Sequence, residues 1–581
     1  MKNIRATLAI VWRIATPYFK SEDKWAGCGL LAAVIVIELA SVGLDVLFNQ
    51  WRNRFYNSLQ EKDWDGFTHN VIFFTVLAAI SVATSVYQLY LNQWLQIRWR
   101  NWMTTRYLGD WLEGANHYRM QLRGDAADNP DQRISDDTKM FVELTLDVGL
   151  KLLNSIVTFI SFVIILWGLS NEAPLHLFGI PYFIPGYLVW AALIYSVFGT
   201  LLTQWIGAPL VNLNFEQQRR EADFRFNLVR VRENSEQIAL LEGEPAERVR
   251  LLDRFSGVIA NWYAIMSRTK RLTAFTASFS QAAVIIPLVL IAPAYFAGKI
   301  LLGSMVQAAE AFGSVQQALS FVVQVYRTMA EWRAVVARLD GFEMSIESAQ
   351  HLRSDSDSIH IAAAGDGDEI DLDKLLVRLP NGAPLIAADS FRIRGHERML
   401  LAGPSGAGKS TLFRAIAGIW PFGSGSISVP AKSTLMMLPQ KPYFPIGSLH
   451  AAIAYPSEAS SFAAERIKEV LQQIGLPQLA SKLDEKEHWN RILSLGEQQR
   501  LGIARALLQA PKFLFLDEAT ASLDEPAETA LYRLLEEKLP DSTIVSIGHR
   551  ATLEAFHQRK AALKREDDHY ALPGSAEVAK P

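Results

Sequence analysis

The chain has 581 residues, of which 50% are hydrophobic and 20% are charged, and its net charge is −3. This length exceeds what a single hydrophobic core serves, so several domains are expected. The charge near zero gives no support for nucleic acid as a partner. The single cysteine, Cys28, excludes an intramolecular disulfide framework and fits a reducing environment for the soluble parts.

The N-terminal segment mixes basic and apolar residues without a small-residue cleavage site, so we expect no cleavable signal peptide. A membrane-spanning helix needs about 20 mainly apolar residues, and several later runs reach that length. They are Trp25–Leu47, Val71–Leu95, Val148–Leu169, Tyr182–Ile206, Phe275–Ala297 and a weaker sixth run, Gly303–Met329, rich in Ala, Gly, Ser and Gln. One such run fits a buried helix of a soluble protein, but this set indicates a membrane domain over residues 1–340.

Basic residues are concentrated in two connections of this domain. They run from Arg98 to Lys139 and from Arg219 to Arg271, whereas Ser170–Pro181 contains none. The positive-inside rule therefore places both basic segments and both termini in the cytoplasm. From Asn214 to Phe255, apolar residues recur at helical spacing among charges of both signs, which predicts long helices that extend the spans.

Three acidic residues, Glu38, Asp45 and Glu310, lie inside the apolar runs. Because a carboxylate in lipid is costly, each is expected to face a water-filled cavity or a polar partner. Two interpretations stay open: a substrate or proton site, and a polar group that holds helices together.

A polar stretch over residues 341–368 is expected to be a linker. A second domain should then occupy residues 369–571, with a short tail over 572–581.

The second domain contains a phosphate-binding loop. The strand-like run Arg398–Ala402 leads into Gly403–Thr411 and then into a helical pattern, which is the setting this motif requires. Glycines let successive backbone N–H groups face one anion, and the helix N-terminus adds favourable charge. We expect Lys409 to reach the outer phosphates and Ser410 to ligate Mg²⁺. The expected nucleotide contacts are Gly403, Pro404, Ser405, Gly406, Ala407, Gly408, Lys409, Ser410 and Thr411.

Further candidates follow other strand-like segments. Asp517 ends an apolar strand and is expected to hold the Mg²⁺ shell, while Glu518 should orient or polarise the attacking water. Gln440 is placed to reach both metal and water, and His549 to contact the γ-phosphate. Taken alone, either of these two would be interpreted as structural.

The stretch Leu493–Arg500 opens another helix, and Ser494 and Gly496 at its start form a second anion site. One chain cannot easily bring this site onto its own phosphate loop, so the pattern indicates a partner chain.

Together these motifs resemble the ATP-binding cassette (ABC) transporters. In that family's terms they are Walker A (Gly403–Thr411), the Q-loop (Gln440), the signature (Leu493–Arg500), Walker B (Phe513–Glu518), the D-loop (Ala521–Asp524) and the switch histidine (His549). The resemblance implies an α-helical six-span transmembrane domain followed by an α/β P-loop ATPase domain that uses ATP and Mg²⁺. It also implies a head-to-tail homodimer, in which ATP lies between Walker A of one chain and Ser494, Gly496, Glu497 and Asp524 of the other.

The sequence departs from the family pattern at three places. Leu495 stands where Gly is usual, and Glu497 stands where Gln is common. The aromatic residue that usually stacks on adenine is missing, and Leu379 is near its expected place.

The sequence of the membrane domain indicates which group of ABC transporters the chain resembles. Asn129–Asp137 and Val231–Leu240 resemble stretches of the subfamily D fatty-acyl half-transporters and of bacterial SbmA/BacA-type peptide transporters. This implies a bacterial inner-membrane importer of peptides, or of bulky hydrophilic solutes such as cobalamin. An exporter of peptides, lipids or drugs stays open, as does an ATP-gated channel or regulator, although the intact Glu518 and His549 disfavour the latter.

Overall fold

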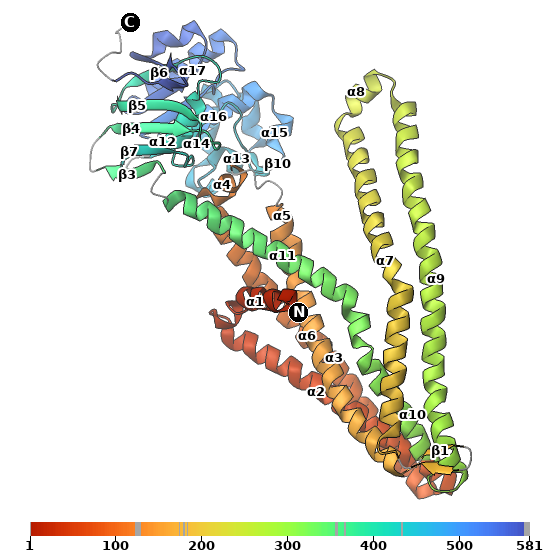
Figure 1. Cartoon of the computed structure of the whole chain (residues 1–581). Coiled ribbons are helices and arrows are strands. Elements are labelled where there is room, and N and C mark those ends of the chain that lie inside the picture. Colours follow the sequence, from red (N-terminus) through yellow and green to blue (C-terminus); the bar gives the residue numbers. More distant parts are fainter. Residues whose placement is uncertain are drawn as a thin grey trace. The chain divides into compact units, whose positions relative to one another are not determined.

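The computed structural model describes residues 2–122, 129–172, 175–177, 180–182, 184–354, 358–364, 368–431 and 434–574 (Figure 1). The chain divides into two compact units. One contains Met1–Tyr107 and Pro130–Gly341, and the other contains Leu108–Asn129 and Phe342–Pro581. The polar runs 355–357 and 365–367 expected in the linker, and the tail beyond residue 574, lie outside the described residues.

The first unit consists mainly of long helices. Five described helices are long and apolar enough to cross a membrane, and they coincide with the five strong apolar runs. They are α2 (Lys24–Glu61), α3 (Trp64–Leu112), α6 (Thr138–Glu172), α7 (Tyr187–Glu233) and α9 (Glu244–Phe296). The shorter elements are α1 (Lys2–Ala15), η1 (Tyr18–Lys20), η2 (Glu113–Ala115), α4 (Asn116–Leu122), α5 (Pro130–Gln132), η3 (Arg133–Asp137), α8 (Ser235–Leu240) and the hairpin of β1 (Leu175–Leu177) and β2 (Ile180–Tyr182).

The weaker sixth run differs from the other five. It forms α10 (Leu302–Leu319) and the start of α11 (Phe321–Ser354), and neither counts as a candidate span among the described helices. Instead α10 packs against α2, α6, α7 and α9. Its polar residues face α2, where Asn53 donates to Gln307 Oε1 at 2.6 Å and Arg52 pairs with Glu310. The polar residues of α10 lower its mean hydropathy, so α10 does not count as a span, although α2 supplies hydrogen-bond and ion-pair partners for them.

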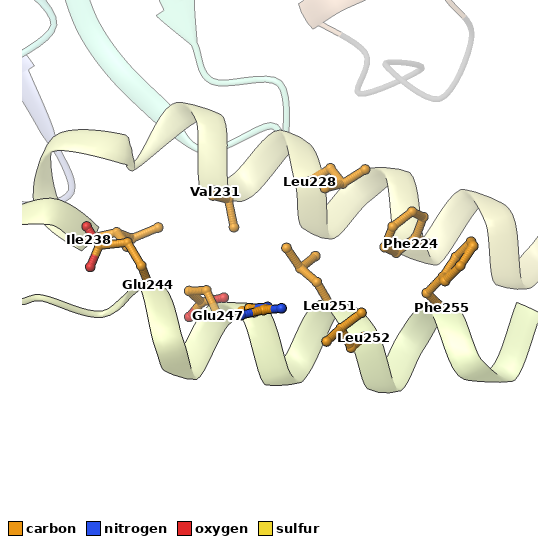
Figure 2. A pocket seen from close by; sticks show the side chains of 10 residues that line it. Phe224, Leu228, Val231, Ile238, Glu244, Glu247, Leu251, Leu252 and Phe255 are labelled. Atoms are coloured by element: carbon orange, nitrogen blue, oxygen red, sulfur yellow. The ribbon is translucent and has the colours of Figure 1, made fainter.

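The helices α7 and α9 form an antiparallel hairpin joined through α8 (Figure 1). They contain 47 and 53 residues, so each is far longer than a span, which confirms that the second basic segment is helical and extends the apolar runs. Near the tip an apolar groove of about 550 Å³ lies between them, with Phe224 and Leu228 of α7 opposite Leu251 and Phe255 of α9 (Figure 2).

The second unit is built on two sheets. One is parallel, with strand order β13-β6-β12-β11-β8, and the other is mixed, with order β14-β15-β5-β4-β7-β3. The strands are β3 (His360–Ala364), β4 (Ile370–Arg378), β5 (Pro384–Ile393), β6 (Arg398–Ala402), β7 (Gly423–Pro430), β8 (Leu435–Leu438), β9 (Gly447–Ser448), β10 (Lys486–Glu487), β11 (Phe513–Asp517), β12 (Thr543–Ile547), β13 (Arg559–Ala562), β14 (Lys564–Glu566) and β15 (His569–Ala571). The helices are α12 (Lys409–Ile416), α13 (Leu449–Ala454), α14 (Ala464–Gln473), α15 (Trp489–Ile492), α16 (Leu495–Gln509) and α17 (Glu525–Lys538), with short turns η4 (Ala459–Ser461), η5 (Pro477–Lys482) and η6 (Ala551–Phe556).

The central strand β11 explains how the two cores of this unit form. Its apolar residues are buried on both faces, as expected for a parallel strand covered on each side. Phe513 and Phe515 join the core shared by the two sheets and α12, whereas Leu514 and Leu516 join the core beneath α13, α14, α16 and α17. Leu122 also packs on the first core, so the segment Leu108–Asn129 groups with this unit although the expected boundary at residue 340 assigns it to the membrane domain.

Candidate functional site

The phosphate-binding loop connects the end of β6 to the start of α12. Gly403, Gly406 and Gly408 have φ values of 155°, 80° and 87°, which favour glycine. A Cβ at Gly408 would lie 2.7 Å from the Leu385 side chain, so the turn also lacks room for one. Lys409 Nζ donates to the carbonyl oxygens of Gly403 at 2.8 Å and Pro404 at 2.9 Å, so this side chain folds back over the loop. Burial lowers the pKa of Lys409, and the carboxylates of Glu518 and Asp517 oppose that effect.

The remaining candidates meet this loop at one edge of the parallel sheet. Strands β6, β12, β11 and β8 are neighbours, and their carboxyl ends lead to the loop, His549, Asp517 and Gln440 respectively. In open α/β sheets this edge is where ligands bind. Ser410 Oγ donates to Asp517 Oδ1 at 2.8 Å. Burial raises the pKa of Asp517, and the bond from Ser410 opposes the rise. A hydroxyl and a carboxylate oxygen side by side fit Mg²⁺, which prefers oxygen ligands.

The Glu518 carboxylate lies between the side chains of Gln440 and His549. The Glu518 backbone has φ = 51°, a strained value for a residue with a side chain, and its N–H donates to Ile547 O at 3.1 Å. His549 Nε2 lies 3.0 Å from Glu518 Oε1, and Gln440 Nε2 donates to Glu518 Oε2 at 3.2 Å. The structure therefore gathers the expected catalytic residues around one carboxylate.

The signature helix begins with a capping box that sequence reasoning missed. Ser494 Oγ accepts from Glu497 N at 3.3 Å, while Glu497 Oε2 accepts from Ser494 N at 2.9 Å and from Ser494 Oγ at 2.8 Å. The pattern Ser-x-x-Glu is a known N-terminal helix signal and could have revealed it. Gly496 lies beside the D-loop, where an added Cβ would come within 3.3 Å of Leu523.

Two other expected contacts have structural partners. Asp524 caps α17 by accepting from Ala527 N at 3.0 Å. Leu379 lies in the turn between β4 and β5, where its N–H donates to Ala383 O at 2.8 Å. Contact of either residue with nucleotide stays a prediction.

A residue that sequence reasoning did not single out, Gln499, is 1% exposed in α16. It is hydrogen-bonded to the Q-loop and the D-loop. Nothing in the sequence pattern separates it from its neighbour Gln498, since both are polar residues of the same helix.

In the first unit, the three acids of the apolar runs have different surroundings. Glu38 is 7% exposed, accepts from Asn154 Nδ2 at 2.8 Å and from Gln88, and lines a cavity of about 290 Å³ with Lys151. Glu310 pairs with Arg52 and accepts from Asn49. Asp45 is exposed on the described chain. Glu38 is therefore the acid that combines burial with a polar cavity.

Comparisons with known proteins agree with this geometry. The family described as ABC transporter transmembrane region 2 matches residues 14–296, and the ABC transporter family matches residues 386–521. An ABC transporter ATP-binding protein of Haemophilus influenzae is 35% identical over 95% of this chain and 92% of its own length. The inner membrane ABC transporter ATP-binding protein YddA of Escherichia coli is 32% identical over 94% and 96%. The lysosomal cobalamin transporter ABCD4 of Mus musculus is 26% identical over 94% and 92%.

Among solved structures, a bacterial Atm1-family ABC exporter with ATP bound superposes with a TM-score of 0.70 at 15% identity, covering 93% of this chain and 95% of that one. This likeness concerns the fold, a helical membrane domain followed by an ABC ATPase domain. Such a domain hydrolyses ATP with Mg²⁺, and the hydrolysis is coupled to transport. The chain therefore belongs to the ABC transporters, as a half-transporter with one membrane domain and one ATPase domain.

Proposed function

We propose that two copies of this chain form an ATP-driven importer of peptides, or of bulky hydrophilic solutes such as cobalamin, in the bacterial inner membrane. The stretches Asn129–Asp137 and Val231–Leu240, which resemble peptide and subfamily D transporters, support this cargo class. The similarity to a cobalamin transporter and to an inner membrane protein supports it further. The distribution of basic residues favours cytoplasmic termini and a cytoplasmic ATPase domain.

The observation that carries the proposal is the arrangement around Glu518. Its carboxylate lies between His549 and Gln440, at the same sheet edge as the phosphate loop. Glu518 would accept a proton from the attacking water, and His549 and Gln440 would hold that carboxylate in place. Lys409 would stabilise charge on the outer phosphates.

Ser410 and Asp517 would hold Mg²⁺, which supplies charge neutralisation to the phosphates when bound. We propose that Gln440 joins the same Mg²⁺ shell. The residues present therefore fit the metal that the family uses.

A second copy would complete the site. The N-terminus of α16, with Ser494 as its cap and Gly496 in its first turn, carries positive partial charge suited to a phosphate. We propose that it contacts the nucleotide held by the phosphate loop of the partner copy. The exposed Leu240 and Leu241, 77% and 81% exposed at the tip of the α7–α9 hairpin, would then be covered by the partner's ATPase domain.

An exporter is the second candidate, because a solved structure with the same fold is an exporter. The two directions predict opposite movement of labelled cargo. In proteoliposomes with the ATPase domains outside, an importer expels cargo from the lumen toward ATP, whereas an exporter accumulates it inside.

The test compares wild type, Glu518→Gln and the control Glu537→Gln in such vesicles. Glu537 is an exposed acid of α17, with a side chain 70% exposed. We expect Glu518→Gln to lose ATP-dependent movement of a labelled peptide or of cobalamin, and Glu537→Gln to retain it. Transport by Glu518→Gln at the wild-type rate would refute ATP-driven transport. ATPase stimulation by neither peptide nor cobalamin would refute this cargo class.

A further inference from the structure

Gln499 connects two loops on either side of the proposed hydrolytic carboxylate. Its side chain is buried in α16, and its Nε2 donates to the main-chain oxygen of Gln440 at 2.9 Å. Its Oε1 accepts from the main-chain N–H of Ser522 at 2.9 Å. One amide group therefore satisfies a carbonyl of the Q-loop and an N–H of the D-loop.

Both hydrogen-bond partners of Gln499 lie near Glu518. The Gln440 side chain donates to the Glu518 carboxylate, and Ser522 belongs to the D-loop that follows Glu518. Main-chain groups in loops have no ladder partners, so this partly buried carbonyl and this partly buried N–H are both satisfied by a side chain that offers a donor and an acceptor. A primary amide does this with one planar group, whereas a carboxylate only accepts.

Gln499 lies in α16, whose first turn is capped by Ser494 of the signature. The helix α16 therefore carries the signature at its N-terminus and is hydrogen-bonded to both the Q-loop and the D-loop. Movement of α16 must displace the Gln440 main chain, and with it the amide that touches Glu518.

We propose that Gln499 is a positioning residue for ATP hydrolysis, which keeps the Q-loop and the D-loop in register with the signature helix. The proposal rests on the roles proposed above for Glu518 and Gln440. It links the site on the chain's own phosphate loop to the signature that the same chain offers to its partner. The hydrogen bonds of Gln499 go to main-chain groups of the Q-loop and the D-loop, so we expect its effect on the rate of hydrolysis and not on ATP affinity.

The test uses two variants and one matched control in the full-length dimer. Gln499→Leu removes both hydrogen bonds. Gln499→Glu keeps an acceptor for Ser522 but sets a carboxylate oxygen against the Gln440 carbonyl. The control is Gln509→Leu, because Gln509 is another glutamine of α16 whose bonds go to the carbonyls of Ala454 and Tyr455, at the end of α13.

We expect Gln499→Leu to lower kcat for ATP by about 10- to 100-fold, the scale of a misplaced catalytic group, with KM for ATP within about threefold of wild type. Gln499→Glu should lose about 10-fold, and Gln509→Leu less than about twofold. Thermal unfolding, measured on the same preparations, gives the folded fraction used to normalise kcat. If Gln499→Leu does not fold, Gln499→Glu decides by the same criteria.

A normalised kcat for the Gln499 variants within about twofold of Gln509→Leu would overturn the proposal and leave Gln499 a structural residue. A rise in KM with unchanged kcat would overturn it as well, because it would place the effect on binding. Failure of the proposed function is separate: it would appear as unimpaired transport by Glu518→Gln.

Discussion

Replacing Glu497 with glutamine is expected to strengthen ATP binding by the proposed homodimer. In the structure the Glu497 carboxylate takes a hydrogen bond from the Ser494 hydroxyl at 2.8 Å. A hydroxyl has one proton, so donation to a phosphate oxygen would replace the bond to this carboxylate. A phosphate oxygen at about 2.7 Å from Ser494 Oγ would then lie no more than about 5.5 Å from the carboxylate oxygen in its present place. Two unit negative charges at about 5.5 Å repel by about 0.8 kcal/mol in bulk water and about 3 kcal/mol at an effective dielectric constant of about 20.

A value near the middle of this range, about 1.4 kcal/mol, corresponds to a tenfold change in affinity. We therefore expect Glu497→Gln to lower KM for ATP about tenfold. Glutamine retains the capping box, since its amide oxygen can accept from Ser494 N. Loss of a negative charge from the first turn of α16 should lower the free energy of unfolding by less than about 1 kcal/mol.

The assay is an ATP titration of hydrolysis in proteoliposomes, combined with thermal unfolding. Glu465→Gln serves as the control, because Glu465 is an exposed acid in the first turn of α14 and lies away from the signature. It should show the same small loss of stability without a change in KM. If KM for Glu497→Gln equals or exceeds that of wild type, the Glu497 carboxylate does not lie close enough to a bound phosphate to repel it.

Three further predictions concern the first unit. Glu38→Gln should lower cargo-stimulated ATPase activity several-fold without changing basal activity, because only the polar cavity is altered. Replacing the exposed Leu240 and Leu241 with serine should abolish transport while ATP hydrolysis continues, because it removes the apolar contact proposed above between the hairpin tip and the partner's ATPase domain. Asp137→Asn should lower stability by about 3 kcal/mol, because the Asp137 side chain is 1% exposed and is paired with Arg133 and Arg338.

Each of these predictions has a result that would contradict it or a measurement that tests its cause. For Glu38, equal stimulation of variant and wild type would return the residue to a helix-packing role. For the leucines, transport at the wild-type rate would exclude the tip as a docking element. For Asp137, burial raises the pKa of the carboxyl, but bonds and charge from Arg338 and Arg133 outweigh it and lower the pKa. Its stabilising effect is therefore complete above about pH 4 and is lost as pH falls through the lower folded pKa, a loss that Asp137→Asn should not show.

Local patterns in the sequence were sufficient for the parts of the fold that depend on local physics. The five strong apolar runs became long helices because length and hydropathy determine a span. Gly403–Thr411 forms the expected loop and helix start because its glycines are required at positive φ. The charged pattern from Asn214 to Phe255 became helix because its apolar residues recur at helical spacing.

Features that depend on contacts between residues far apart in the chain could not be predicted from the sequence. The polar face of α10 looked weak as a span because Asn53 and Arg52, which satisfy it, lie far away in the chain. Gln499 looked like any helical glutamine because its partners come from two distant loops. The grouping of Leu108–Asn129 with the ATPase unit depends on tertiary contacts, such as the packing of Leu122, which no periodicity predicts.

The length of α9 gives the hairpin the properties of a mechanical lever. At about 1.5 Å per residue its 53 residues extend about 80 Å, of which about 30 Å suffices for the apolar layer. The remaining arm of about 50 Å would turn a tilt of about 5° at the membrane boundary into a displacement of about 4 Å at its tip. Pro287 and Pro293, which interrupt backbone hydrogen bonding, both lie in the apolar part of α9, so bending is concentrated there while the charged arm stays stiff.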